Sequence, residues 1–310
     1  MSITRNPIFV IGSINTDMVA MTKNLPAPGE TVMGGEFMMT AGGKGANQAV
    51  AVSRLGSSVS LIGKVGTDVF GKELLKILDD ECIDISMLKE HSGESGTAFI
   101  YVYKETSENQ IIVIPGANSF AEEIQIDDKT LSSTDIVVSQ LETSPQETQK
   151  LFSRSRKLNC YTILNTAPAI GVSEGLIEES DLLVMNETEL STLSGDQIFS
   201  GNSYSEIDES IKKIVLSNSK SAIVTLGSRG VYVFEKQRGT FIPGLEVIAL
   251  DTTGSGDCFV GALASHYSNH GHLLDAANFA NQAASLSVMK KGASASMPYL
   301  NEVVNLSEIT

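Results

Sequence analysis

The chain has 310 residues, 42% of them hydrophobic and 19% charged, a composition typical of a globular protein with a substantial core. Its formal net charge of −15 disfavours binding to nucleic acid or to anionic lipid. No run of the sequence approaches the roughly 18 apolar residues of a membrane span, so we expect neither a nucleic acid nor a membrane as partner.

The cysteines are three in number and far apart in the chain, at Cys82, Cys160 and Cys258. This spacing fits neither a disulfide framework nor a CxxC metal site. We therefore expect a reducing compartment, the cytoplasm or, in a eukaryote, also the nucleus.

The N-terminal segment predicts a buried strand that leads into polar side chains. Residues 8–14 form a short apolar run, and Asn15 and Asp17 follow it directly. Polar groups at the end of a buried strand are typical of ligand sites in open α/β sheets. Residues 31–39 are apolar-rich and predict a strand outside the main sheet.

A glycine-rich segment then opens a predicted helix that runs to about Leu55. Its glycines, around Gly43, permit close approach of the backbone to a ligand, and Asn47 lies one turn into the helix. The segment is not a Walker A loop. It does not complete GxGxxG either, because Gln48 takes the place of the last glycine.

Residues 66–73 match the pattern G-x-x-x-x-G-K, but we interpret them as an ordinary helix start. Glu73 replaces the hydroxyl residue that would hold Mg²⁺ in a phosphate-binding loop. Asp68 is therefore interpreted as a helix N-cap. Further on, residues 97–103 and 111–114 alternate as a hairpin does, and with residues 17–22 and 31–39 they predict a small separate sheet.

From residue 136 on, strands and helices alternate regularly. Strands are predicted at residues 136–138, 161–164, 182–185 and 222–225, and helices at residues 145–158 and 206–218. This order implies a parallel sheet with right-handed crossovers. Each strand ends in polar or glycine residues, and these ends share one edge of the sheet.

The segment 247–263 predicts a strand, a glycine turn and a helix. The first turn of such a helix has backbone N–H groups without partners and a positive partial charge, which together favour an anion. Asp257 stands beside this anion site, where a carboxylate suits a general base that takes a proton from an attacking hydroxyl. The residues are equally typical of a helix N-cap after an ordinary glycine turn, so both interpretations stay open.

Taken together, the two glycine segments resemble the two signatures of the ribokinase family of sugar kinases, also called the phosphofructokinase-B family. Residues 41–56 resemble the first signature and residues 251–262 the second, and the similarity spans nearly the whole chain. It implies a ribokinase-like α/β fold with three αβα layers and a mainly parallel central sheet, in a single domain of residues 1–310. A small β-sheet lid of about residues 15–40 and 95–115 would close over the sugar and form a homodimer contact.

The resemblance also implies a role for each matching residue. Asp257 would be the general base on the primary hydroxyl of the sugar and one of its contacts, and the amides of Gly254, Ser255 and Gly256 would stabilise the transferring phosphoryl group. The other implied sugar contacts are Asn15, Asp17, Gly43, Lys44, Asn47 and Glu142. The implied ATP contacts are Asn186, Thr225, Gly227, Ser228, Gly230, Gly256 and Asn281.

Two metal ions are implied by the same resemblance. Glu189 would order Mg²⁺ through water. A monovalent activator, K⁺, would be held at Asp251, Thr253, Ser287, Lys290, Gly292 and Ser296, with the middle positions contributing backbone carbonyls.

In detail the segments are most similar to family members that phosphorylate ribose. The implied reaction is ATP-dependent phosphorylation of D-ribose at O5 to D-ribose 5-phosphate. One alternative is a kinase of the same family for deoxyribose, a nucleoside or another sugar. A second is a non-catalytic sugar sensor, against which Asp257 and the intact Gly-Ser-Gly sequence argue.

Overall fold

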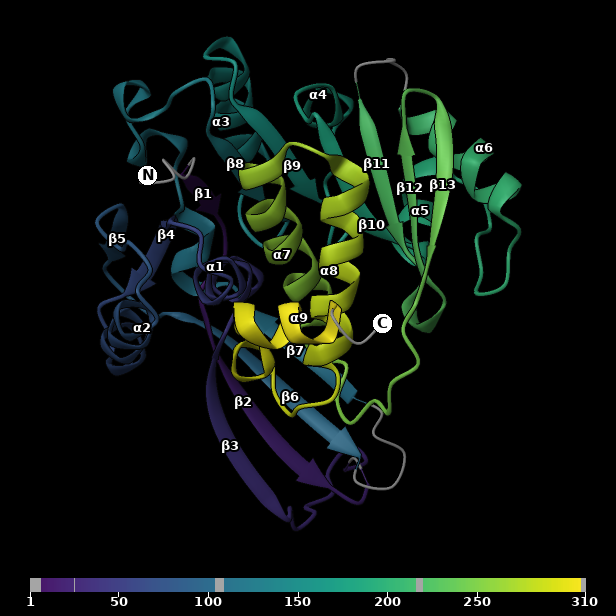
Figure 1. The fold of residues 1–310 in the computed structure, drawn as a ribbon. Helices are drawn as coiled ribbons and strands as arrows, with labels where there is room; N and C mark the ends of the chain where they lie inside the picture. The colour runs from purple at the N-terminus through teal and green to yellow at the C-terminus, as the bar shows by residue number, and fades with distance from the viewer. Residues whose placement is uncertain (1–6, 25, 104–108, 216–219, 308–310) are drawn as a thin grey trace.

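The computed structural model describes residues 7–24, 26–103, 109–215 and 220–307, and Figure 1 shows how they are arranged. The strands within these ranges form a nine-stranded sheet in the body of the molecule and a separate four-stranded sheet. Predicted residues 216–218, at the end of the helix expected at 206–218, lie outside the described ranges.

The large sheet has the strand order β13-β12-β11-β10-β9-β8-β1-β4-β5. Its strands are β1 (Ile8–Ile11), β4 (Val59–Gly66), β5 (Leu88–His91), β8 (Ile136–Ser139), β9 (Tyr161–Asn165), β10 (Leu182–Asn186), β11 (Ser221–Thr225), β12 (Gly230–Glu235) and β13 (Arg238–Pro243). All neighbours from β5 to β11 pair parallel, which confirms the predicted parallel sheet, although β5 itself was not predicted. β12 and β13 add an antiparallel hairpin at one edge.

Helices cover both faces of the large sheet. One face carries α1 (Lys44–Arg54), α2 (Val69–Asp80), α7 (Ser255–His270), α8 (Leu273–Ser287) and α9 (Leu300–Ser307); the other carries α3 (Pro145–Lys157), α4 (Glu174–Glu178), α5 (Glu187–Ser194) and α6 (Tyr204–Ile214). In Figure 1, α7 and α8 cross in front of the sheet. No helix of the described chain is long and apolar enough to cross a membrane.

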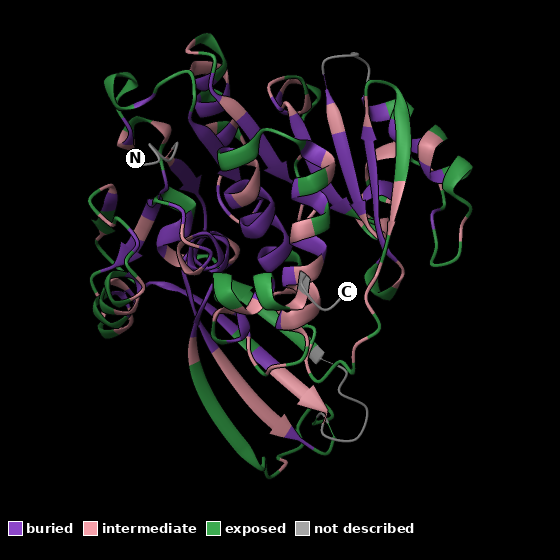
Figure 2. Cartoon of the chain, in the orientation of Figure 1, coloured by how far each residue is buried: buried purple, intermediate pink, exposed green. Residues whose placement is uncertain are grey.

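The central strands of the large sheet contribute side chains to two hydrophobic cores. Ile8 and Val10 of β1 pack with the helices of one face, while Phe9 and Ile11 pack with those of the other. A strand buried on both faces needs such a continuous apolar run, because successive side chains point to opposite sides. The three-layer αβα fold with a mainly parallel sheet is thereby confirmed, and Figure 2 shows its buried centre in purple.

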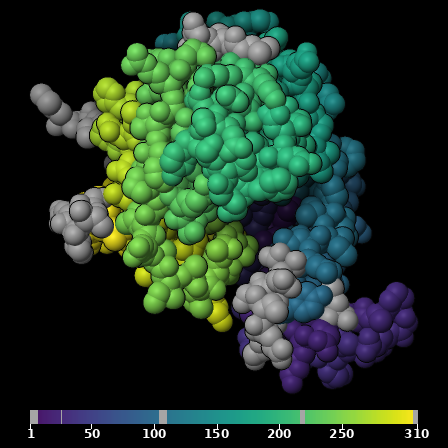
Figure 3. Space-filling view, turned by 90° about the vertical axis from the view of Figure 1, so that its right-hand side faces the viewer, coloured from purple at the N-terminus to yellow at the C-terminus, as the bar shows by residue number. Residues whose placement is uncertain are grey.

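The second sheet has the order β3-β2-β6-β7, with β2 (Asn15–Thr22), β3 (Glu36–Gly42), β6 (Gly96–Tyr103) and β7 (Asn109–Ile114). β2 and β6 pair parallel, and the two outer pairs are antiparallel. This sheet projects from the body, and Figure 3 shows a hollow between the two. β3 starts at Glu36 and not at residue 31, because Gly34 and Gly35 precede it and glycine weakens a strand.

Two helix starts separate the alternatives that the sequence left open. Asp68 caps α2, since its carboxylate accepts a hydrogen bond from Gly71 N at 2.8 Å, as predicted. The strand predicted before the glycine turn was wrong: residues 247–250 form no strand, because Leu250 N donates to Val288 O at the end of α8 and not to a neighbouring strand. The predicted helix is present: in α7 the N-cap is Gly254 and the helix begins at Ser255. Asp257 is thus the third residue of the helix and does not serve as its N-cap.

Candidate active site

The candidate site lies where the carboxyl ends of the parallel strands meet the first turns of α1 and α7. Asn47 in α1 donates a hydrogen bond from Nδ2 to Oδ2 of Asp257 in α7 at 2.9 Å, across 210 positions of sequence. Glu142, after β8, contacts Lys44 at the start of α1. The two glycine segments and the strand ends therefore form one site.

The first turn of α7 is shaped by two glycines. Gly254 has φ 75°, and a Cβ there would lie 2.9 Å from Cα of Ala293, so glycine satisfies both the conformation and the space. A Cβ on Gly256 would meet no atom within 4 Å, because a cavity opens beside it. Ser255 N donates to Thr252 O at 3.2 Å, which leaves the following N–H groups of the turn to face an anion.

Asp257 is buried, with 6% of its surface exposed, and both oxygens of its carboxylate accept amide hydrogen bonds. Asn47 Nδ2 donates to Oδ2, and Gln48 Nε2 donates to Oδ1 at 3.1 Å. Burial raises the pKa of Asp257, while the ammonium of Lys44 and the two amides oppose that increase. A fixed carboxylate with a raised pKa beside a cavity is suited to accept a proton.

Lys44 and Glu142 form a partly buried pair next to Asp257. One Glu142 oxygen accepts from Ser13 Oγ at 2.6 Å and from Lys44 N at 3.2 Å, and the other lies 4.0 Å from Lys44 Nζ. The charge of Asp257 is the main cause that raises the pKa of Lys44, against the effect of burial. Lys44 therefore stays protonated and supplies a local positive charge.

Asp17 brings a further carboxylate to the site from β2. It packs against Gly42, where a Cβ would lie 2.1 Å from Oδ2 of Asp17. Burial raises the pKa of Asp17 to about 7, the charges of Glu142 and Asp257 add to the increase, and Lys44 opposes it. Clustered carboxylates beside an open cavity suit a neutral ligand with several hydroxyl donors.

The side chain of Asn15 is fixed by Asn118. Asn118 Nδ2 donates to Asn15 Oδ1 at 2.7 Å, and Asn118 also bonds the backbone N and O of Ile14. A Cβ on Gly96 would lie 2.1 Å from Asn118 Nδ2, so this contact requires a glycine in β6. The amide oxygen of Asn15 thus faces Asn118, so its amide nitrogen points away from Asn118.

A polar cavity of about 220 Å³ opens at the first turn of α7. Lys44, Asn186, Glu189 and Asp257 contribute its charged and amide side chains. It is also lined by Asn165, Ala167, Val184, Met185, Thr225, Gly254 and Gly256.

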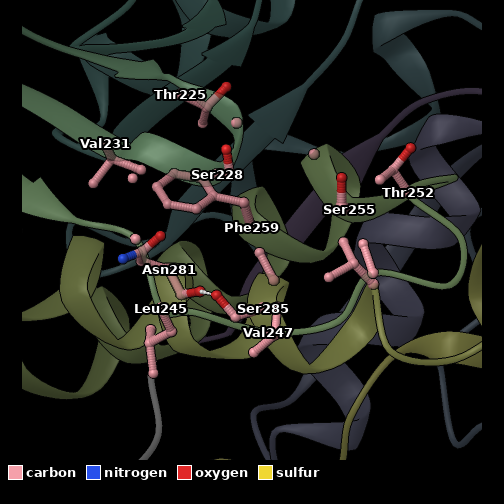
Figure 4. A pocket seen from close by; sticks show the side chains of 17 residues that line it. Thr225, Ser228, Val231, Leu245, Val247, Thr252, Ser255, Phe259, Asn281 and Ser285 are labelled. Atoms are coloured by element: carbon pink, nitrogen blue, oxygen red, sulfur yellow. Dashed lines mark hydrogen bonds between the residues drawn. The ribbon is translucent and has the colours of Figure 1, made fainter.

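A second, more apolar cavity of about 410 Å³ lies beside it, between β11, β12, α7 and α8. It brings together six of the seven predicted ATP contacts, namely Thr225, Gly227, Ser228, Gly230, Gly256 and Asn281. Figure 4 shows Phe259, Val231, Leu245 and Val247 around it, and Ser285 donating to the backbone of Asn281 at 2.8 Å. Thr225 and Gly256 line both cavities, so the two adjoin at the start of α7.

Glu189 and Asn186 form a capping box at the start of α5. The Glu189 carboxylate accepts from Asn186 N at 2.8 Å and from Asn186 Nδ2 at 3.1 Å, and burial raises its pKa. Among the described residues no group of three or more His, Cys, Asp and Glu side chains could hold a metal ion. One carboxylate near phosphate groups still fits Mg²⁺, which commonly keeps its waters and binds through substrate phosphates.

The residues predicted to hold K⁺ lie on adjoining loops. Asp251 accepts hydrogen bonds from Thr253 N and Gly292 N, both at 2.9 Å, and these bonds keep its pKa below the usual value although burial alone would raise it. Lys290 Nζ bonds Glu302 at 2.6 Å, so only its carbonyl remains for an ion. The buried hydroxyls of Ser287 and Ser296 donate to carbonyl groups. This all-oxygen donor set fits a hard cation.

Sequence reasoning missed three parts of the site. Asn118 bonds Asn15 and Ser13 bonds Glu142, and both partners are predicted sugar contacts. Gln48, which bonds Asp257, was noted only because it stands where GxGxxG has its last glycine. The apolar wall of the larger cavity was missed as well. The position of Gln48 directly after Asn47 was the only signal in the sequence, since contacts between distant segments leave none.

Comparison with known proteins identifies the family to which this fold and site belong. The pfkB family carbohydrate kinase model matches residues 5–300. The chain therefore belongs to the pfkB family of carbohydrate kinases.

Curated relatives and solved structures show which members of the family the chain is similar to. A ribokinase of Haemophilus influenzae is 34% identical over 98% of this chain and 99% of its own, and a deoxyribokinase of Salmonella typhi is 33% identical over 97% and 99%. A ribokinase structure from Thermotoga maritima has a TM-score of 0.88 and 33% identity, covering 97% and 99% of the two chains. An Arabidopsis thaliana ribokinase complexed with ribose and ATP has a TM-score of 0.88 and 28% identity, covering 99% and 100%.

The raised pKa of Asp17 predicts a pH-dependent stability of the free protein. Between its usual value of 3.8 and about 7 the folded state holds a proton that the unfolded state has lost, so the free energy of unfolding falls as pH rises through this window. Asp17→Asn should therefore flatten the fall between pH 4 and pH 8, by about 1 kcal/mol or more, since one pKa unit corresponds to about 1.4 kcal/mol.

Urea denaturation at several pH values measures the effect. Asp80→Asn, at an exposed position of α2, is the control and should keep the wild-type slope. Equal slopes in Asp17→Asn and the wild type would show that Asp17 titrates normally.

Proposed function

We propose that this protein catalyses the ATP-dependent phosphorylation of D-ribose at O5, giving D-ribose 5-phosphate and ADP. The observation that carries the proposal is the position of Asp257, at the first turn of α7 where the two cavities adjoin and next to the carboxylates of Asp17 and Glu142. The ribokinases among the relatives and similar structures support it.

On the acceptor side, the sugar hydroxyls would donate to carboxylate and amide oxygens. Asp17 and Glu142 offer carboxylates, and Asn47 offers Oδ1, which is buried and has no partner among the described residues. Leaving such an atom unpaired costs about 1–3 kcal/mol, which a hydroxyl donor would recover. Gly43, with φ 87°, and the amide of Asn15 complete the proposed sugar contacts.

In the chemical step the O5 hydroxyl attacks the γ-phosphorus of ATP. Asp257 accepts the hydroxyl proton as the new P–O bond forms and the bond to ADP breaks. Backbone amides in the Gly254–Gly256 stretch and the ammonium of Lys44 stabilise the negative charge on the transferring group. In the free protein Ser255 N already donates to Thr252 O. To contact the phosphoryl group, the Ser255 amide would have to give up that hydrogen bond.

On the donor side, the adenosine part of ATP would occupy the larger cavity and its phosphates would extend past Thr225 and Gly256 to the start of α7. Asn186, Thr225, Gly227, Ser228, Gly230, Gly256 and Asn281 are the proposed ATP contacts. Mg²⁺, when bound, neutralises phosphate charge, and Glu189 would hold it through water. K⁺ would bind at the Asp251 and Gly292 loops, next to Gly254.

We also propose a homodimer that forms through the outer face of the small sheet. Register places Phe37, Met39, Phe99, Ile112 and Ile114 on this face, opposite the one that faces the body. Each of them is at least 36% exposed, which makes an apolar patch of the kind that marks interfaces.

The proposed location is the cytoplasm. Free thiols at Cys82, Cys160 and Cys258 support it, since a reducing compartment keeps thiols free.

The nearest alternative is a kinase of the same family for 2-deoxyribose, which the similarity to a deoxyribokinase favours. A nucleoside or another sugar, and a sensor without catalysis, are more remote. The acceptor that gives the highest kcat/KM distinguishes a ribose kinase from the other kinases. Any turnover at all excludes the sensor.

The function is tested by ADP release from ATP with Mg²⁺ and K⁺, using D-ribose, 2-deoxyribose, fructose, adenosine or no acceptor. D-Ribose should give the highest kcat/KM, about 5- to 150-fold above 2-deoxyribose, because the missing hydroxyl leaves a buried partner unpaired. Asp257→Asn should still bind ribose and ATP, with kcat lower by about 10²–10⁴. A higher kcat/KM for another acceptor would reassign the substrate. Near-normal kcat in Asp257→Asn would remove its role as base.

The cation site predicts that activity depends on the monovalent ion. At constant ionic strength, replacing K⁺ with Na⁺ or Li⁺ should lower kcat, because the smaller ions fit the oxygen donors less well. Asp251→Asn should abolish both this difference and any K⁺-specific increase in thermal stability, whereas Asp80→Asn should preserve them. Equal activity and equal melting temperatures in all three salts would contradict the site.

The dimer proposal predicts a change of mass on a single substitution. Sedimentation should give twice the chain mass for the wild type, and Phe37→Lys should shift it toward the monomer by placing a charge in the apolar interface. Phe199→Lys is the matched control, because Phe199 is also 63% exposed but lies outside the small sheet. A monomeric wild type, or an undisturbed Phe37→Lys dimer, would rule this interface out.

A further inference from the structure

Gln48 lies behind the proposed general base and does not line either of the two cavities at the start of α7. Its surface is fully buried, and its side chain bonds residues from three other segments of the chain. Nε2 of Gln48 donates to Asp257 Oδ1 at 3.1 Å and to Asn165 Oδ1 at 3.2 Å, while its Oε1 accepts from Gln140 Nε2 at 2.6 Å. The amide therefore has partners at both ends.

These partners permit only one orientation of the Gln48 amide. If it were reversed, its oxygen would face two acceptor oxygens and its nitrogen would face the nitrogen of Gln140. Asn165 is itself fixed, since its Nδ2 donates to Val184 O at 3.2 Å. The donor end of Gln48 must therefore point at Asp257.

The network is maintained at a cost to stability. Oε1 of Gln140 is buried without a hydrogen-bond partner in the described chain, which costs about 1–3 kcal/mol. The backbone is shaped around it, because a Cβ on Gly12 would lie 2.1 Å from that oxygen. Such local costs are typical of functional sites.

Close packing of α1 on α7 brings Gln48 within reach of Asp257. A Cβ on Gly261 of α7 would lie 2.6 Å from Cβ of Ala51 and from the carbonyl oxygen of Gln48. The side chain that bonds Asp257 is therefore anchored by a helix contact that tolerates little movement.

We propose that Gln48 is a positioning residue for phosphoryl transfer, whose amide, oriented by Gln140 and Asn165, fixes the rotation of the Asp257 carboxylate toward the acceptor hydroxyl. Asn47 holds the other carboxylate oxygen but is also a proposed sugar contact, so Gln48 is the Asp257 partner that lies outside the proposed sugar contacts. This inference rests on the proposed function, since it requires Asp257 to act as the base.

The test is Gln48→Met, which keeps the length of the side chain and removes the amide. We expect kcat to fall about 10- to 100-fold, the loss that follows removal of a hydrogen bond to a charged group, with KM for ribose and ATP nearly unchanged. Gln125→Met is the matched control, because the amide of Gln125 also makes three hydrogen bonds, in its case to backbone groups, but lies outside the site. It should keep kcat.

The pH profile of kcat distinguishes positioning from a general loss of structure. The groups that face Asp257 are Lys44 and Asn47 of α1, Glu142 after β8, Asp17 of β2 and Glu189 of α5. Removing a donor to the charged carboxylate raises its pKa, so the acidic limb of the profile should move to higher pH in Gln48→Met. Gln48→Glu, which places a carboxylate of like charge beside Asp257, should move the acidic limb further to higher pH.

Wild-type inactivity with ribose would overturn the proposed function and this inference with it. With an active wild type, kcat within twofold of normal in Gln48→Met, or an unmoved acidic limb in Gln48→Glu, would overturn the positioning role alone. An increase in KM at constant kcat would assign Gln48 to binding and would also overturn it.

Discussion

The arrangement of the site depends on keeping one carboxylate charged inside the protein. A buried and unpaired carboxylate costs several kcal/mol, and Asp257 is almost fully buried. Lys44, two side-chain amides and the first turn of α7 each reduce that cost. All of them come from α1 and α7, so the close packing of these two helices is a requirement of the chemistry as much as of the fold.

The polar groups of the site fall into two sets, one suited to the hydroxyl groups of the acceptor and the other to the phosphates of the donor. Carboxylates gather where hydroxyl donors would bind, at Asp17, Glu142 and Asp257, and backbone N–H groups gather where phosphates would bind, at the start of α7. A chain with a net charge of −15 can accept an anionic nucleotide in this way, because the positive potential is local. Among the described residues, no charged side chain lines the larger cavity, which is proposed to take the nucleoside.

Much of the fold could be predicted from the sequence, because buried parallel strands are continuous apolar runs and their polar ends mark the ligand edge. The β12–β13 hairpin was missed because its turn, with positive φ at Lys236 and Gln237, lacks the usual Asn-Gly signal. In the site, the glycine turns and the residues beside them were predicted, and the larger cavity brings together six of the predicted ATP contacts. Gln48 and Asn118 were not found, since their roles arise only from contacts between distant segments.

The small sheet connects the site to the surface through a single strand. β2 carries Asn15 and Asp17 at its start and Met18 and Ala20 a few residues on, where its outer side is continuous with the patch around Phe37 and Phe99. Paired strands move together, so any displacement of this sheet changes the distance from Asp17 to Glu142 and Asp257. Because the charges of Glu142 and Asp257 raise the pKa of Asp17, the position of the sheet and the protonation of Asp17 are physically linked.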